Sequence, residues 1–131
     1  MLTAYNAKDC VIIWDGVYLT GLSETMVTGE KNEEFFSDEV GAQGDVCRSE
    51  TNDPTGTVTI TLQTTSPQKG MLLEDAKSGK TAPLWVINKS IGERFGGNLA
   101  RIKNYPSLEH ARDGGEREFE FAVADYDVDA I

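Results

Sequence analysis

The sequence has no long apolar run and no basic N-terminus. Among its 131 residues, no segment approaches the about 20 consecutive apolar residues that an α-helix needs to cross a bilayer. Residues 1–8 also lack the basic and apolar regions of a signal peptide. We therefore expect a soluble protein, without a membrane partner, that stays in the cytoplasm where it is made.

Cysteine is scarce, with only Cys10 and Cys47 in the chain. Each lies in a strand-like run, and a protein without an export signal experiences reducing conditions. We predict that both are buried free thiols. The alternative is a disulfide between them.

Basic residues are also few, since 12 Lys and Arg stand against 22 Asp and Glu and give a formal net charge of -10. Wrapping nucleic acid relies on clustered cations that displace counterions from phosphates, so this composition argues against it. Residues 24–50 and 109–131 each carry a net -6, whereas residues 66–105 carry +4. Opposite patches on one subunit would attract copies head to tail. The alternative is charge balance within the subunit and a solvated acidic surface.

Metal-binding patterns are missing. The single histidine, His110, has no cysteine or second histidine at zinc-ligand spacing. Asp125, Asp127 and Asp129 alternate as in calcium loops, but the glycine and the bidentate glutamate of those loops are absent. We expect no metal, and we interpret the aspartates as part of a solvated terminal arm.

Catalytic patterns are missing as well. Residues 92–97 match no glycine-rich phosphate loop. Carboxylate pairs such as Glu33 and Glu34 are plentiful, but glycoside hydrolysis needs two that face each other across a cleft. Trp14 and Trp85 lie in apolar runs, which favours core packing over stacking on a sugar. We expect a protein that is not an enzyme and has no cofactor.

What the chain does contain is glycine and β-favouring residues in a length typical of one domain. The 13 glycines and the frequent threonines favour strands joined by turns over a helical bundle. We predict a single domain over residues 1–131. Its fold class is mainly β with one helix.

The N-terminal half predicts a hairpin followed by a long excursion. Residues 9–14 are apolar on both faces of a period-2 pattern, as in a strand covered on both sides. Asp15-Gly16 is a tight-turn signal before residues 17–19. The acidic stretch at about 22–50 alternates weakly, so we expect a long loop or a protruding, irregular hairpin, with a possible strand at residues 45–51.

Two later segments alternate clearly. In residues 57–63, Val58, Ile60 and Leu62 share one face, and the threonines and Gln63 share the other. In residues 116–124 three apolar residues alternate with three glutamates. Each segment predicts a strand with one buried face and one polar face.

One helix is expected between these strands. Ser66 is placed as its N-cap and Pro67 as its first residue, while Gly79 is placed to end it. Met71, Leu72 and Ala76 would form its inner face. After the helix, residues 84–88 and 98–104 predict two further strands, the second with Arg101 and Lys103 on one face.

Taken in order, these segments resemble the tail tube protein family of contractile-tailed, myovirus-type phages, which also occurs in R-type contractile bacteriocins. The motifs are the hairpin at Asp15-Gly16, then residues 29–32 (Gly-Glu-Lys-Asn), residues 56–62 (Gly-Thr-Val-Thr-Ile-Thr-Leu) and residues 65–67 (Thr-Ser-Pro). Residues 56–67 are the most specific part. The acidic stretch between Lys31 and Thr51 is longer than in the family pattern.

The resemblance implies two packed antiparallel sheets, a β-sandwich or barrel, flanked by a helix. It implies homohexameric rings that stack helically into the inner tube of the tail, which conducts DNA and supports the sheath. Expected partners are the sheath, baseplate and tail terminator proteins, with the tape measure protein and DNA passing through the lumen without specific binding. The protein would be assembled in the host cytoplasm and would reside in the virion tail.

A lumen that lets DNA travel should offer phosphates no ion pairs. Two strand faces fit this requirement, one neutral and one negative. They comprise Thr57, Thr59, Thr61 and Gln63, and Glu116, Glu118 and Glu120. We predict that at least one of them lines the channel.

Ring closure and stacking would use other parts of the chain. Residues 1–7 and 126–131 are short arms suited to pairing with a neighbour. Stacking would bring the acidic stretch of one ring against a basic surface of the next. The candidates are Glu30, Lys31, Glu33, Glu34, Asp38 and Glu39, with Lys77, Lys80, Arg101 and Lys103. The main alternative function is that of a monomeric small β-domain that binds a carbohydrate or a peptide.

Overall fold

A computed structural model describes residue 2 and residues 4–131, and in this part of the chain ten strands accompany one α-helix and one short 3-10 helix. The strands are β1 (Cys10–Trp14), β2 (Val17–Tyr18), β3 (Leu22–Lys31), β4 (Phe36–Val40), β5 (Val46–Glu50), β6 (Gly56–Gln63), β7 (Ala82–Asn88), β8 (Glu93–Ile102), β9 (Glu116–Val123) and β10 (Asp127–Ala130). The helices are the 3-10 helix η1 (Ala7–Asp9) and α1 (Lys69–Ser78).

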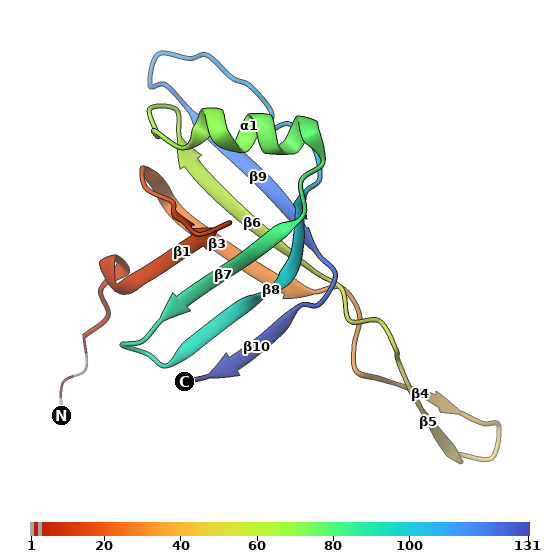
Figure 1. Cartoon of the computed structure of the whole chain (residues 1–131). Helices are drawn as coiled ribbons and strands as arrows, with labels where there is room; N and C mark the ends of the chain where they lie inside the picture. Colours follow the sequence, from red (N-terminus) through yellow and green to blue (C-terminus); the bar gives the residue numbers. More distant parts are fainter. Residues whose placement is uncertain (1, 3) are drawn as a thin grey trace.

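Eight strands form one antiparallel sheet that folds over on itself into two packed layers (Figure 1). Seven follow the order β2-β1-β7-β8-β9-β6-β3, and β10 pairs with β8. β8 joins the layers, because its first half pairs with β7 and β10 and its last residues pair with β9. The predicted fold class, mainly β with two packed antiparallel layers and one helix, is confirmed.

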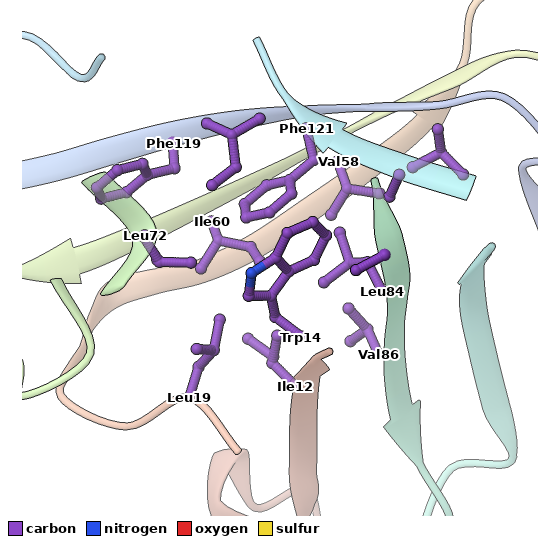
Figure 2. Packing of buried hydrophobic residues seen from close by; sticks show 14 of the residues in the cluster. Ile12, Trp14, Leu19, Val58, Ile60, Leu72, Leu84, Val86, Phe119 and Phe121 are labelled. Atoms are coloured by element: carbon purple, nitrogen blue, oxygen red, sulfur yellow. The ribbon is translucent and has the colours of Figure 1, made fainter. Parts of the chain in front are cut away.

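The core lies between the layers and is built by alternation along the strands, although Thr61 on the outer side of β6 is also buried. Val58, Ile60 and Leu62 of β6 are fully buried, as are Phe119 and Phe121 of β9. From the other layer the Trp14 indole meets the Phe121 ring edge to face, with ring centroids 5.1 Å apart (Figure 2). The strands predicted at residues 57–63 and 116–124 are confirmed, with the predicted faces inward.

The N-terminal hairpin forms where Asp15-Gly16 predicts it. Both turn residues adopt positive φ, 50° at Asp15 and 78° at Gly16, which glycine tolerates readily. Ile12 of β1 is buried, whereas Val11 and Ile13 on the opposite face are only half-buried. The expectation that β1 is covered on both sides is therefore wrong within one subunit.

The helix begins later than predicted. Its first residue is Lys69 and its N-cap is Gln68, because the Ser66 hydroxyl donates a hydrogen bond to the Thr20 carbonyl (2.7 Å) and does not cap the helix. Its end at Gly79 is confirmed, with a left-handed φ of 70°.

Packing of α1 against the sheet follows the predicted inner face. Leu72 is fully buried, and Met71 and Ala76 pack against the core while half-buried. Asp75 accepts a 2.8 Å hydrogen bond from the buried Trp14 indole, which joins the helix to the other layer.

The acidic stretch divides into two different structures. Residues 22–31 form the strand β3, which pairs with β6 with a register shift between Leu22 and Val27, whereas the sequence predicts a long loop or an irregular hairpin there. β4 and β5 form a separate two-stranded sheet that projects from the body (Figure 1). All ten of their residues are exposed.

Other expectations need correction. Cys10 and Cys47 are free thiols as predicted, but Cys10 is only half-buried and Cys47 is exposed. Trp14 is buried as predicted, whereas Trp85 is only half-buried on the outer face of β7, beneath the Arg94 guanidinium at 4.6 Å from its ring centroid.

The two chain ends also differ from expectation. The C-terminal segment is not a free arm, because β10 pairs with β8 of its own chain. In the N-terminal arm, residues 1 and 3 lie outside the described residues. No helix in the described residues has the length and hydrophobicity of a membrane span.

Candidate assembly surfaces

The two predicted lumen faces form one surface. β6 and β9 are adjacent and antiparallel, and their register places Thr59 opposite Glu120 and Thr61 opposite Glu118. Gln63 lies opposite Glu116 in the same way. The neutral row and the acidic row are therefore neighbours on the outer face of one layer, which we call the threonine-glutamate face. It consists of Thr57, Thr59, Thr61, Gln63, Glu116, Glu118 and Glu120.

This surface continues onto the flanking strands. β3 adds Thr28 opposite Thr59 and Glu30 opposite Thr57. On the other side β8 adds Arg101, which lies opposite Ala122. Two residues that the sequence suggested for stacking, Glu30 and Arg101, thus belong to the same surface as the lumen candidates.

Lys103 also lies beside the threonine-glutamate face. Its backbone amide donates to the Glu120 carbonyl (2.9 Å), and its ammonium lies 3.4 Å from the Thr57 hydroxyl. With Glu30, Arg101 and Lys103 included, the surface carries four carboxylates and two cations, a net -2. Both cations come from the β8 side, but the Lys103 ammonium reaches Thr57 of β6. The remaining hydroxyls and carboxylates of β6 and β9 offer a phosphate hydrogen-bonding groups without an ion-pairing partner.

The base of the projecting hairpin is fixed to the body by hydrogen bonds. The Lys31 ammonium donates to the carbonyls of Glu33 (2.7 Å) and Asp53 (2.8 Å) and lies 4.9 Å from the centre of the Phe35 ring. The Thr55 hydroxyl and amide both donate to the Asp53 carboxylate, at 2.6 and 2.9 Å. These bonds hold the pKa of Asp53 below its ordinary value. Lys31 therefore fixes where the hairpin leaves the body.

Beyond its base, the hairpin presents two distinct faces. Phe36, Asp38 and Val40 of β4 share one face, and β5 adds Val46 and Arg48 to it. Asp38 and Arg48 form an exposed ion pair at 2.9 Å in the middle of this face. The opposite face carries Ser37, Glu39, Cys47 and Ser49, while Glu33 and Glu34 are exposed just before β4.

The remaining stacking candidates lie at the end of α1. Lys80 forms an ion pair with Asp15, and this hydrogen bond raises the pKa of Lys80. Lys77 is exposed in the last helical turn. It borders a shallow groove of about 350 Å³ lined by Leu73, Glu74, Tyr105 and Leu108.

The molecule also has open sheet edges. β2 and β3 are the terminal strands of the sheet path, and β10 lies beside β8. β3 is ten residues long and uses one edge to pair with β6. A long open edge is a template for pairing with another chain.

Sequence reasoning missed three features of these surfaces. Adjacency of β6 and β9 is a long-range pairing that no local pattern reveals. The groove beside Lys77 is formed in part by the loop of residues 103–115. Buried Arg117 holds this loop by donating a hydrogen bond to the Glu109 carbonyl at 2.8 Å. The apolar hairpin face had a signal, since Phe36, Val40 and Val46 interrupt an acidic segment.

A metal centre finds no support in the described residues, where no group of three or more His, Cys, Asp or Glu side chains is arranged to hold an ion.

Comparison with known proteins gives two kinds of match. The family model described as "Bacteriophage PhiTE tail tube protein" matches residues 14–129. No curated protein matches the sequence.

Solved structures share the fold at low sequence identity. One chain comes from the sheath/tube terminator of PVC, an extracellular contractile injection system, in the extended state; it has a TM-score of 0.70 at 10% identity, covering 98% of this chain and 99% of that one. A chain of the PVC sheath-tube complex has a TM-score of 0.70 at 11% identity, with coverage of 98% and 93%. A chain from the virion of a native gene transfer agent particle has a TM-score of 0.65 at 15% identity, with coverage of 98% and 99%.

Proposed function

The chain belongs to the bacteriophage PhiTE tail tube protein family and is a structural subunit of a phage or phage-like tail, and from this premise we propose that hexameric rings of it stack into the inner tube of a contractile tail. The threonine-glutamate face lines the bore. The observation that carries this proposal is the register of β6 and β9, which gathers every predicted lumen residue on one surface.

The bore must let a polyanion pass without holding it. Hydroxyl and carboxylate groups alternate across β6 and β9, so a phosphate meets either a neutral group or a repulsive one. Arg101 and Lys103 come from the β8 side, where Lys103 lies beside Glu120, while Glu30 lies on β3 at the opposite side of the same surface. The carboxylates outnumber the cations, which keeps the wall repulsive as a whole.

Rings close by pairing of sheet edges between copies. The ten-residue edge of β3 supplies one side of each junction, and the β2 or β10 side of the neighbouring sheet supplies the other. Each junction then satisfies backbone groups that an isolated subunit leaves to solvent. Residues 1–7 remain a predicted accessory arm at this junction.

Stacking brings the projecting hairpin of one ring against the next ring. The predicted contacts are made by Glu33, Glu34, Asp38 and Glu39 on one side and by Lys77 and Lys80 on the other. Arg101, Lys103, Glu30 and Lys31 remain predicted participants at the edges of this junction.

The assembled tube would sit inside a sheath and meet terminator and baseplate proteins at its ends, as in the sheath-tube and sheath/tube terminator structures that share its fold. The tape measure protein and DNA would occupy the bore in turn. The role is structural, without catalysis or cofactor, and assembly takes place in the host cytoplasm.

Imaging of the purified protein tests assembly. We expect rings or tubes in negative-stain electron microscopy and a large species in size-exclusion chromatography. A stable monomer that binds a carbohydrate or a peptide would instead support the alternative function and overturn the proposal.

A charge reversal tests which face lines the bore. Tubes of the double variant Glu118→Lys/Glu120→Lys should retain a short single-stranded DNA oligonucleotide protected from nuclease, whereas wild-type tubes should retain none. The matched control is Glu109→Lys/Asp113→Lys, which adds the same charge at two exposed residues outside the threonine-glutamate face and the predicted stacking contacts, and should leave any bound DNA open to nuclease. Equal protection in both variants would place the threonine-glutamate face outside the bore.

A further inference from the structure

We propose that the stacking contact is an apolar docking site, in which the hairpin face of Phe36, Val40 and Val46 from one copy enters the groove of Leu73, Tyr105 and Leu108 on a second copy. This inference rests on the proposed function, since it assigns the contact that joins successive rings. It differs from a purely electrostatic junction because apolar side chains supply the main contact.

Contacts within one chain do not explain the exposed apolar side chains of the hairpin. Phe36, Val40 and Val46 are 51%, 66% and 62% exposed, although all three lie on one face of β4 and β5. A two-stranded sheet without a packed face is marginally stable in water. On this face the Asp38–Arg48 ion pair lies between Phe36 and the two valines, so the apolar side chains flank a neutralised charge pair. Exposed apolar side chains on one face of a projecting element are typical of a contact surface.

The groove offers the complementary chemistry. Leu73 comes from α1, and Tyr105 and Leu108 come from the loop of residues 103–115. Tyr105 is 54% exposed and Leu108 is 63% exposed, so the groove opens to solvent along its apolar side. Its two charged lining residues in the described chain, Glu74 and Lys77, come from the helix.

The two surfaces lie at opposite ends of the body. In Figure 1 the hairpin projects from one end of the sheet, whereas α1 lies across the other. A patch and a complementary pocket at opposite ends of one subunit form a heterologous contact, which repeats from copy to copy along an axis. The bonds of Lys31 and Asp53 hold the base of the hairpin, so its direction is set before docking.

Charge favours a second copy as the occupant. Residues 33–50 carry six carboxylates and one arginine, a net -5. At the rim of the groove Lys77 is exposed, and so is Glu74 one turn earlier. An acidic hairpin with an apolar face therefore meets an apolar groove in which Lys77 can pair with a hairpin carboxylate while Glu74 repels it, which fixes orientation in addition to contact.

Disulfide trapping tests the pairing directly. In a Cys10→Ser/Cys47→Ser background, Val40→Cys combined with Leu108→Cys should give a ladder of covalent oligomers when assembled tubes are oxidised. The matched control pairs Leu108→Cys with Ser37→Cys, on the same strand but the opposite hairpin face, and should stay monomeric on a denaturing gel. Equal ladders from both pairs, or none from the first while tubes are present, would overturn the proposal.

A charge in the contact provides a second readout. Val40→Asp and, separately, Leu108→Asp should each shorten the tubes at least about tenfold while rings persist, because a carboxylate is costly to bury against apolar side chains. Ser37→Asp and His110→Asp add the same group on the opposite hairpin face and elsewhere in the loop, and should leave tube length unchanged. Long tubes in the first two variants would overturn the docking proposal but leave the proposed function intact. Wild-type protein that never forms rings or tubes would overturn the proposed function itself.

Discussion

The sheet body and the projecting hairpin differ in how their side chains are buried. In the body, β6 and β9 alternate between fully buried and polar residues, and their inner faces meet Trp14 and Leu84 of the other layer. In the hairpin every residue of β4 and β5 is exposed. The body thus derives its stability from contacts within one chain, whereas the hairpin has side chains whose burial requires another molecule.

The test with the largest expected effect compares substitutions of two phenylalanines, one in the body and one in the hairpin. Phe121→Ala should lower the free energy of unfolding of the unassembled chain by about 3–5 kcal/mol, because it empties the centre of the core against Trp14. Phe36→Ala, on the hairpin, should change it by less than about 0.5 kcal/mol. Urea denaturation measures both values. Similar losses in the two variants would show that the hairpin is packed in the free subunit.

A second test probes a close backbone approach within the body. A side chain at Gly56 would overlap the ring of Tyr126, which itself packs near Phe95 with ring centroids 6.5 Å apart. Gly56→Ala should therefore cost about 1–3 kcal/mol through overpacking. Gly70→Ala is the control, since open space surrounds a Cβ there. A neutral Gly56→Ala would mean that Tyr126 moves aside at little cost.

A third test removes the hairpin altogether. Replacing residues 33–50 with a short Gly-Ser linker, while keeping Lys31 and Asp53, should change the free energy of unfolding by no more than about 1 kcal/mol, because loop-length effects are small. Thermal unfolding of the chain measures this. Tube formation should be lost in the same variant, and loss of folding instead would contradict the contrast between the two regions.

The smallest effect concerns the junction of the two regions. Hydrogen bonds from Thr55 lower the pKa of Asp53, so the carboxylate stabilises the base above its ordinary pKa, and that contribution is lost as pH falls through the lowered value. Thr55→Val should move the pKa of Asp53 back up toward its ordinary value. Carboxyl chemical shifts in an NMR titration report it, with Thr57→Val as a control that spares both hydrogen bonds to Asp53.

Sequence patterns predicted the parts of the fold that local physics decides. The alternation in β6 and β9 and the turn at Asp15-Gly16 were sufficient to place those strands and their inner faces. The helix start was misplaced because the Ser66 hydroxyl bonds to Thr20, a residue distant in sequence. The burial predicted for Cys47 failed because β5 pairs only with another exposed strand in the described chain.

The candidate site was predicted residue by residue but not as a surface. The threonines and the glutamates were recognised as two polar rows, yet their union depends on the pairing of β6 with β9, which are separated by α1, β7 and β8 in the chain. Long-range register of this kind is a property of the assembled sheet. Arg101 and Lys103 were grouped with the stacking surface for the same reason, because charge counts along a sequence do not show which strand lies beside which.

The clamped base of the hairpin has a mechanical meaning for a stacked tube. An element held by Lys31, Asn32 and Asp53 behaves as a short lever whose exit angle is fixed by the body. If each such lever engages the ring above, its angle dictates the screw rotation between neighbouring rings. The hydrogen bonds at the base of each hairpin would then determine the helical pitch of the whole tube. Loss of these bonds would give tubes whose twist varies from one to the next.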